Sequence, residues 1–292
     1  MAFRIRRILV AIGDPRRPPA AQLRKAARLA SATGAHLELC HVIHPANARD
    51  VDEARTRMER LGARKVFAGL AVRTCLAIDA PPHEAIIRRA RGIRADLIIA
   101  STVPHRRGER LLLRNTDWEL IRHTTCPLLL VKAHGTWRAP VVLAAIDPFH
   151  ARAKAARLDA RLLEAAVAIA KPLRGEAHAF HAWLPFVATL PGAMVQPAAM
   201  SLPPEAEAVH GEAVRRTFDR LAAQSGIAPA RRHLRMGDLA TQLGNTVQRT
   251  RARIVVMGAV SRSALARLFI GSSAEHLLDR LSCDVLIIKP KT

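Results

Sequence analysis

The stretch Cys126-Pro-Leu-Leu-Leu-Val-Lys132 returns 157 residues later as Cys283-Asp-Val-Leu-Ile-Ile-Lys289, with the cysteine, the apolar run and the final lysine in the same order. The same offset carries Asp96-Leu-Ile-Ile-Ala-Ser101 onto Arg253-Ile-Val-Val-Met-Gly258. Recurrence at a fixed offset indicates an internal duplication. We therefore expect two copies of one domain, in residues 1–137 and 138–292.

The second copy is longer than the first. Near the start of each copy the offset falls to 134, where Ile8 matches Val142, and it is 140 where His41 matches His181. Most of the extra residues fall in 184–204, a stretch with repeated proline and no charged residue. Proline disfavours helix and central strand, and an apolar loop is poorly tolerated in water. We predict that this insertion forms the lid or wall of an apolar pocket, or packs on the rest of the protein.

Short apolar runs alternate along the chain with longer stretches of helical periodicity, such as 21–33, 83–91 and 239–250. The runs show little polar alternation, which favours strands buried on both faces. This order predicts an α/β fold with two tandem Rossmann-like domains, each a five-stranded parallel sheet with helices on both faces. The predicted strands are 7–12, 36–42, 72–78, 97–101 and 128–131 in the first copy, and 141–146, 176–182, 231–236, 254–258 and 285–288 in the second.

The chain is strongly basic, with a formal net charge of +22 that comes almost wholly from arginine. Such a charge raises the hypothesis of a polyanion or nucleic-acid partner. Acidic residues are interspersed with the basic ones, however, and aromatic residues make up only 3% of the chain, so stacking platforms for single strands are scarce. An arginine-rich solvated surface is the favoured interpretation, and nucleic acid is not.

Hydropathy predicts no membrane span and no signal peptide, because no run reaches the roughly 18 apolar residues of a spanning helix. We therefore expect a cytoplasmic protein.

The four cysteines are scattered without a C-x-x-C pair, and we expect them to be reduced and mostly buried. The nearest approach to a metal motif is His123-Thr-Thr-Cys126, which we interpret as structural, so no metal site is predicted.

Two histidines, His41 and His181, end the second predicted strand of each copy. They are either polar residues of a cleft or hydrogen-bonded strand-end histidines, and the second interpretation is favoured. No nucleophile with a base, and no paired acids, can be recognised in the sequence. We therefore predict no catalytic residue and a protein that works by binding.

Ligands of open parallel sheets bind beyond the carboxyl ends of the strands. In the second copy this edge contains Asp147, after the first strand, and the segment that follows the fourth strand. That segment, Val255-Val-Met-Gly-Ala-Val-Ser-Arg-Ser-Ala-Leu-Ala-Arg-Leu-Phe-Ile-Gly-Ser-Ser-Ala-Glu275, resembles the signature of the universal stress protein family. Asn115-Thr-Asp-Trp-Glu-Leu-Ile-Arg122 is similar to the degenerate first half of its tandem E-type members.

The resemblance implies an adenine nucleotide alpha hydrolase-like fold, a stress-response role through binding, and two domains packed as an intramolecular pseudo-dimer, with a homodimer as a further alternative. The closing strands, 128–131 and 285–288, have apolar edges that need cover. We therefore predict that they lie together across the pseudo-two-fold axis.

The family's nucleotide loop is Gly, two residues, Gly, nine residues and Gly-Ser/Thr, with an Asp after the first strand. Here Ser261 and Ala264 occupy the first two glycine positions, whereas Gly271-Ser272 matches. The candidate cofactor-binding residues are Asp147, Gly258, Ser261, Ala264, Gly271, Ser272 and Ser273. Side chains in place of glycine obstruct the approach of phosphate to backbone amides, so ATP, the candidate cofactor, is expected to bind weakly or not at all.

A capping box, Ser272-Ser-Ala-Glu275, also explains the part of the loop that matches. At the offset of 157, the three loop positions correspond in the first copy to Pro104, Arg107 and Arg114. We therefore expect no nucleotide pocket in the first copy. An apolar small molecule bound beside the insertion, or a polyanion bound by arginine, are the alternative ligands.

Overall fold

The computed structural model describes residues 3–102, 116–132, 135–148, 153–184, 204–258 and 281–290. Its elements alternate between strand and helix, and the predicted strands are confirmed to within one residue at each end. The first half contains β1 (Arg7–Ile12), α1 (Ala20–Thr33), β2 (His36–Ile43), η1 (Pro45–Asp50), α2 (Val51–Gly62), η2 (Lys65–Phe67), β3 (Val72–Ile78), α3 (Pro82–Gly92), β4 (Leu97–Ser101), α4 (Thr116–His123) and β5 (Leu128–Val131). The second half contains β6 (Val141–Ala145), α5 (Ala153–Ala170), β7 (Glu176–Trp183), α7 (Pro204–Gln224), η5 (Pro229–Arg231), β8 (Arg232–Met236), α8 (Leu239–Thr250), β9 (Ile254–Gly258) and β10 (Asp284–Ile288).

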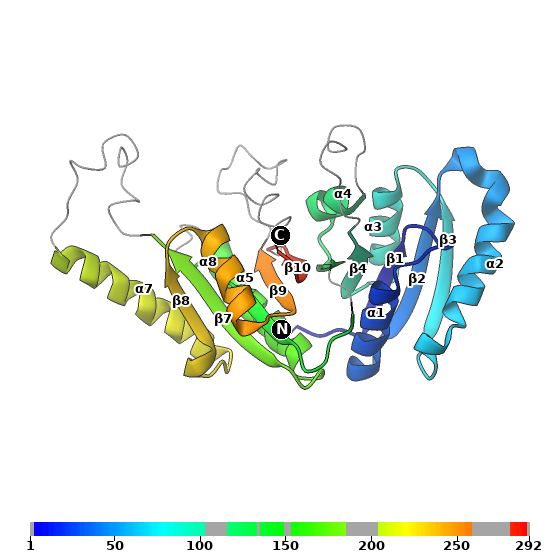
Figure 1. The fold of residues 1–292 in the computed structure, drawn as a ribbon. Coiled ribbons are helices and arrows are strands. Elements are labelled where there is room, and N and C mark those ends of the chain that lie inside the picture. Colours follow the sequence, from blue (N-terminus) through cyan, green and yellow to red (C-terminus); the bar gives the residue numbers. More distant parts are fainter. Residues whose placement is uncertain are drawn as a thin grey trace.

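All ten strands form one sheet in the order β3-β2-β1-β4-β5-β10-β9-β6-β7-β8. The five strands of each half are parallel, as predicted. The halves join where β5 pairs antiparallel with β10, with Leu128 opposite Ile287 and Leu130 opposite Val285. Figure 1 shows the two halves side by side along this sheet. The predicted pairing of the closing strands is therefore confirmed, and each strand covers the apolar edge of the other.

Helices cover both faces of the sheet, as expected for parallel strands. Neighbouring residues of a strand point to opposite faces, so Ile8 and Val10 belong to one buried cluster whereas Leu9 belongs to the other. The first cluster includes residues of α1, α2, α5 and α7, and the second includes residues of α3, α4 and α8. Both clusters extend through both halves of the chain, so the core is continuous across the junction.

Local sequence signals explain where several helices begin and end. Gly34 takes a left-handed conformation with φ of 69°, and its amide N–H donates to the carbonyl of Ala30, which ends α1. Asp238 caps the start of α8 by accepting a hydrogen bond from the backbone N–H of Thr241. Proline opens α3 at Pro82, where its missing N–H costs no helical hydrogen bond. Within the described residues, none of the helices is long and apolar enough to cross a membrane.

Candidate functional site

Two of the predicted site residues, Asp147 and Gly258, lie at the carboxyl edge of the second half. β6 and β9 are neighbours in the sheet, with Ala145 opposite Met257 in the register. Gly258 ends β9, and Asp147 follows β6 after one further residue, so both lie at the same edge and both are partly buried. The other predicted residues, Ser261, Ala264, Gly271, Ser272 and Ser273, lie outside the described residues.

The backbone at Asp147 is held by neighbouring side chains. Its amide N–H donates to Oδ1 of Asp159, a buried carboxylate on α5, over 3.0 Å. One residue earlier, the carbonyl oxygen of Ile146 lies 3.0 Å from Nδ1 of His181 on β7. A carbonyl only accepts, so Nδ1 of His181 carries the proton and donates. These contacts fix the end of β6 beside Gly258.

Burial keeps the His181 ring neutral. The pKa of His181 is lowered by desolvation, and the hydrogen bond to Ile146 and the charge of Asp147 oppose this shift only in part. The ring packs against Phe218 of α7, with centroids 6.3 Å apart. His181 is therefore a hydrogen-bonded strand-end histidine, as favoured from the sequence.

Packing alone explains why position 258 is a glycine, independently of any ligand. A Cβ atom at this position would lie 2.8 Å from Cδ2 of Leu158 on α5. The absent side chain allows α5 to approach the end of β9 closely, next to the backbone of Asp147. Gly258 therefore shapes this edge through helix packing.

The same edge of the first half contains a cleft of about 420 Å³. His41 lines it, and Nδ1 of His41 donates to the carbonyl of Ile12 over 2.8 Å, which repeats the arrangement of His181 and Ile146. Gly13 and Asp14 follow β1 here and also line the cleft. The duplication has thus preserved the strand-end histidine in both domains.

Ion pairs occupy the cationic side of this first cleft. Glu53 of α2 lies 3.1 Å from Nη2 of Arg16 and also pairs with Arg57, four residues along the helix. Hydrogen bonds from Arg57 and then Arg16 lower the pKa of Glu53. A phosphate group would have to compete with this carboxylate for both guanidinium groups. The absence of a nucleotide pocket from the first domain stays a prediction.

A second cleft, of about 740 Å³, lies where β1 and β4 begin, at the opposite edge of the sheet. Asp96 lies within it and accepts hydrogen bonds from the backbone amides of Arg6 and Arg7, over 2.8 and 3.0 Å. Arginine side chains from both halves of the chain line this cleft: Arg4, Arg6, Arg7, Arg91, Arg94 and Arg161. We call it the arginine cleft.

His123 and Cys126 take part in different contacts. Sγ of Cys126 donates to the carbonyl of Ala95, over 3.2 Å, whereas His123 lies on α4 with Nε2 3.2 Å from Oε2 of Glu119. His83 of α3 stacks on the His123 ring. The spacing of four residues between Glu119 and His123 indicates two side chains on the same side of a helix, so the sequence could have shown that they lie close together. No sequence pattern indicated that His83 joins them.

The insertion at 184–204 lies outside the described residues except for its two ends.

Comparisons with known proteins agree with this architecture. The model of the "Universal stress protein family" matches residues 4–132 and 142–289. Universal stress protein E of Escherichia coli K12 is 27% identical over 232 residues, covering 76% of this chain and 70% of that protein. A homologue in Haemophilus influenzae is 27% identical over 201 residues, covering 67% and 62%.

Solved structures show the same fold over nearly the whole chain. A functionally unknown protein of Pseudomonas aeruginosa PAO1 superimposes with a TM-score of 0.72 at 26% identity, covering 98% of this chain and 93% of that one. A universal stress protein of Archaeoglobus fulgidus gives a TM-score of 0.67 at 16% identity, covering 99% and 98%, which shows the fold alone. The chain therefore belongs to the universal stress protein family and carries two copies of its domain in tandem.

Proposed function

We propose that this protein is a non-enzymatic stress-response protein that binds a small ligand at the carboxyl edge of its second domain. The observation that supports this most is that Asp147, just after β6, and Gly258, at the end of β9, lie at the same edge of two neighbouring strands. Open parallel sheets bind ligands at such strand ends. The cytoplasmic location stays a prediction.

The groups described at this edge favour binding over chemistry. His181 is a candidate for a base, because donation by Nδ1 to the Ile146 carbonyl leaves the basic nitrogen at Nε2, but the residue is only 5% exposed. Asp159 is also buried and holds the backbone of Asp147. A general base must reach the substrate proton within hydrogen-bonding distance, and the burial of His181 and Asp159 limits such access.

Nucleotide is the ligand class that the family pattern suggests, and we propose that ATP binds weakly at most. Ser261 and Ala264 replace the first two glycines of the loop pattern. A Cβ at either position hinders contact between phosphate oxygens and backbone amides, and it disfavours positive φ.

Incubation of the purified chain with ATP and Mg²⁺, followed by chromatographic measurement of ADP, tests the non-enzymatic part of this proposal. We expect no ADP above the buffer control over hours. Turnover by the natural chain that disappears in Asp147→Ala would contradict the proposal, because it would place chemistry at this edge. Asp52→Ala, which changes a fully solvated carboxylate on α2, is the matched control.

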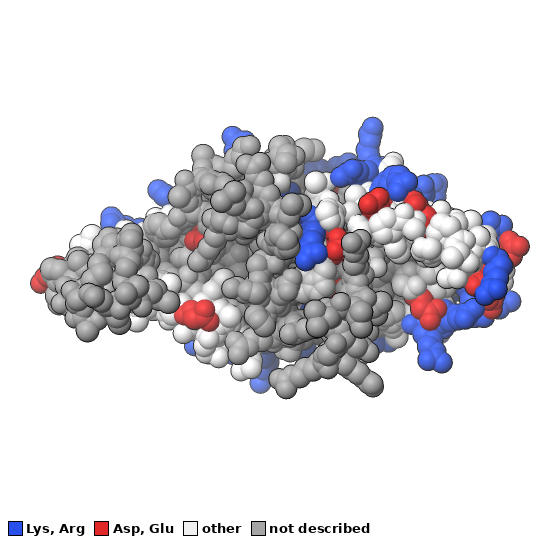
Figure 2. Space-filling model, turned by 90° about the horizontal axis from the view of Figure 1, so that it is seen from above, with Lys and Arg blue, Asp and Glu red and all other residues white. Residues whose placement is uncertain are grey.

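Polyanion binding is a second candidate function, and the arginine cleft is the observation that favours it. Six arginines line one concave surface, where the field of several like charges is reinforced. On the described part of the face in Figure 2, acidic side chains alternate with basic ones, so the basic surface is not continuous there. Two acidic residues, Asp96 and Glu164, also line the arginine cleft, and for this reason we rank polyanion binding second.

Fluorescence anisotropy with a labelled single-stranded DNA tests this second function. Binding through the cleft should weaken steeply as salt rises, because each contacted phosphate releases counterions. Arg4→Ala with Arg91→Ala should reduce both the affinity and the salt slope. Arg215→Ala with Arg220→Ala, which removes two exposed charges from α7, is the control of equal charge. Equal losses in the two double variants would indicate non-specific attraction to net charge.

A further inference from the structure

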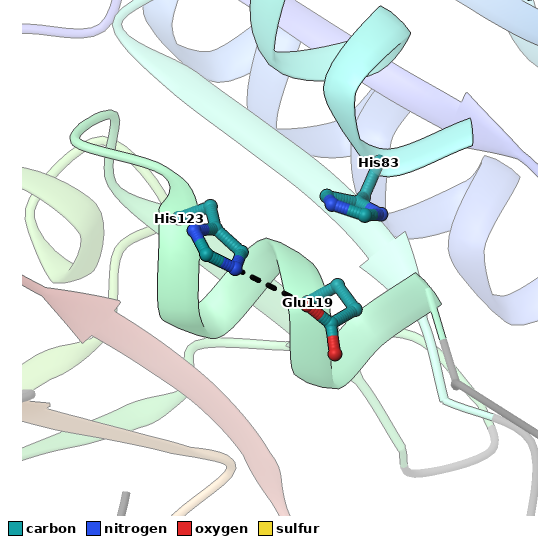
Figure 3. A group of neighbouring side chains, drawn as sticks. All are labelled: His83, Glu119 and His123. Carbon is teal, nitrogen blue, oxygen red and sulfur yellow. Dashed lines mark ion pairs between the residues drawn. The ribbon is translucent and has the colours of Figure 1, made fainter. Parts of the chain in front are cut away.

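Two helices of the first domain bring together three side chains of the types that bind metal ions. His83 lies in the first turn of α3, and Glu119 and His123 lie one turn apart on α4. One ligand atom from each side chain lies within 4.8 Å of the other two. Figure 3 shows the two imidazoles and the carboxylate grouped between the facing helices. Among the residues that the structure describes, this is the only trio with that property.

The separations suit a small ion with few ligands. Nε2 of His123 and Oε2 of Glu119 are 3.2 Å apart. Ligand atoms at Zn–N and Zn–O bond lengths of about 2.0–2.2 Å lie roughly 3.3 Å from one another around a tetrahedral ion. The His83 and His123 rings are stacked with centroids 5.6 Å apart, so the His83 ring must turn toward the ion to supply the third bond.

The donor set selects the class of ion. Imidazole nitrogens favour zinc and the late first-row divalent metals, whereas magnesium and calcium prefer oxygen donors alone. Two histidines and one carboxylate leave the fourth position of a tetrahedral ion open to water. An ion here would therefore be held at a three-residue site with one exchangeable ligand.

The surroundings of Glu119 resemble the support that metal ligands usually have. Oε1 of Glu119 accepts a hydrogen bond from Nη1 of Arg122 over 3.0 Å, which leaves Oε2 directed at His123. The Arg122 carbonyl in turn accepts a hydrogen bond from Nζ of Lys289 on the other domain. Such contacts orient a metal-binding carboxylate and strengthen its hold on the ion. The Glu119 side chain is 15% exposed and that of His123 is 50% exposed, so solvent reaches the cluster from the His123 side.

The second domain does not repeat the cluster in its sequence. At the offset of 157, the three positions are Ala240, His276 and Arg280. The trio is therefore peculiar to the first domain and is not a packing feature that the duplication would have kept in both.

From these observations we propose that His83, Glu119 and His123 form a binding site for a divalent transition metal of the zinc class, which joins α3 to α4. The carboxylate is required, because His83 lies near the positive end of the α3 dipole and the whole chain is basic. The histidines bind a metal ion through a neutral ring nitrogen.

Cobalt titration of the full chain tests this proposal. The protein is purified with a chelator, dialysed, and titrated with Co²⁺ while the visible d–d absorption is recorded. We expect saturation at one ion per chain and displacement by Zn²⁺. Glu119→Gln and His83→Gln should each weaken binding by about tenfold or more, because a three-ligand site loses one bond. His36→Gln, which removes an exposed imidazole elsewhere, should change nothing.

Three results would overturn the proposal. The first is no saturable Co²⁺ absorption in the natural chain, and the second is equal affinity in the natural chain and in both site variants. The third is a sulfur-to-cobalt charge-transfer band, which would assign the ion to a cysteine. Circular dichroism of each variant confirms that the helices remain, so that loss of binding cannot be confused with loss of the fold.

Discussion

Nζ of Lys25 lies 2.6 Å from Oδ2 of Asp284, in an ion pair that joins the first helix of one domain to the last strand of the other. Both side chains are almost fully buried, at 1% and 0% exposure. Asp284 also accepts hydrogen bonds from Nε1 of Trp137 and from the backbone amide of Lys132, each over 2.9 Å. One carboxylate therefore fixes the helix, the linker and the closing strand at the junction of the two domains.

Replacing Asp284 by Asn should destabilise the protein strongly. The change leaves the Lys25 ammonium buried without its counter-charge, which typically costs about 3–5 kcal/mol. The free energy of unfolding from urea denaturation measures the effect. Asp52→Asn, in an exposed pair with Arg55, is the matched control and should cost less than about 1 kcal/mol. Equal effects of the two substitutions would show that the buried pair does not secure the junction.

Acid should destabilise the second domain through a pair of histidines. Nδ1 of His178 lies 2.9 Å from Nε2 of His233 on the neighbouring strand. Burial, followed by the charges of His178, Arg235 and Arg249, lowers the pKa of His233 to about 4, and burial also lowers the pKa of His178. Because the folded-state pKa is depressed, the stability is complete above the unfolded value of about 6.5 and is lost as the pH falls towards 4.

We therefore expect the free energy of unfolding to fall by on the order of 1 kcal/mol or more between pH 7 and pH 5. His233→Leu should flatten that part of the pH profile, since it removes one of the groups that must stay neutral. The exposed His36 provides the control, because His36→Leu should leave the slope unchanged. A profile that is equally steep in His233→Leu would show that these rings do not control the acid limb.

Cys75 should be the most reactive of the four thiols. It faces Cys40 across β2 and β3, and the hydrogen bond with Cys40, helped by the charge of Arg89, lowers the pKa of Cys75 to about 7. Burial raises the pKa of Cys126 and of Cys283 to about 12. Iodoacetamide should therefore alkylate Cys75 first, at a rate that rises through neutral pH, because the thiolate is the nucleophile.

Mass spectrometry of tryptic peptides gives the site and rate of this alkylation. Cys40→Ala should shift the midpoint of the Cys75 rate profile to higher pH, since the stabilising donor is lost. Cys283→Ala should leave the midpoint in place. Preferential modification of Cys126 would contradict this assignment.

Much of the fold could be predicted because strands buried on both faces leave long apolar runs, as at Leu128–Val131, and because each run occurs twice. The pairing of β5 with β10 followed from the same apolar edges. Lys25 could not be placed in this way, since a lysine in a helix normally indicates a solvated surface and its partner lies in the other domain. The position of His83 beside Glu119 could not be predicted either, because only the packing of α3 on α4 brings the two residues together.

The candidate site was predicted only in part. Asp147 and Gly258 could be placed because Gly258 ends β9 and Asp147 follows β6, and the parallel topology sets the order of these strands. The engagement of Asp159 with the backbone of Asp147 could not be foreseen, since it depends on where α5 crosses the sheet. The lid predicted at 184–204 lies outside the described residues between its ends and stays a prediction.

Calorimetric titration with ATP tests the central claim most directly, because that claim is a binding edge in the second domain with an impaired phosphate loop. We expect no saturable heat from the natural chain. Ser261→Gly combined with Ala264→Gly should gain affinity by about tenfold or more, equivalent to about 1.4 kcal/mol, and a further Asp147→Ala should remove the gain. A micromolar dissociation constant for the natural chain, unchanged by the two glycines, would contradict the account.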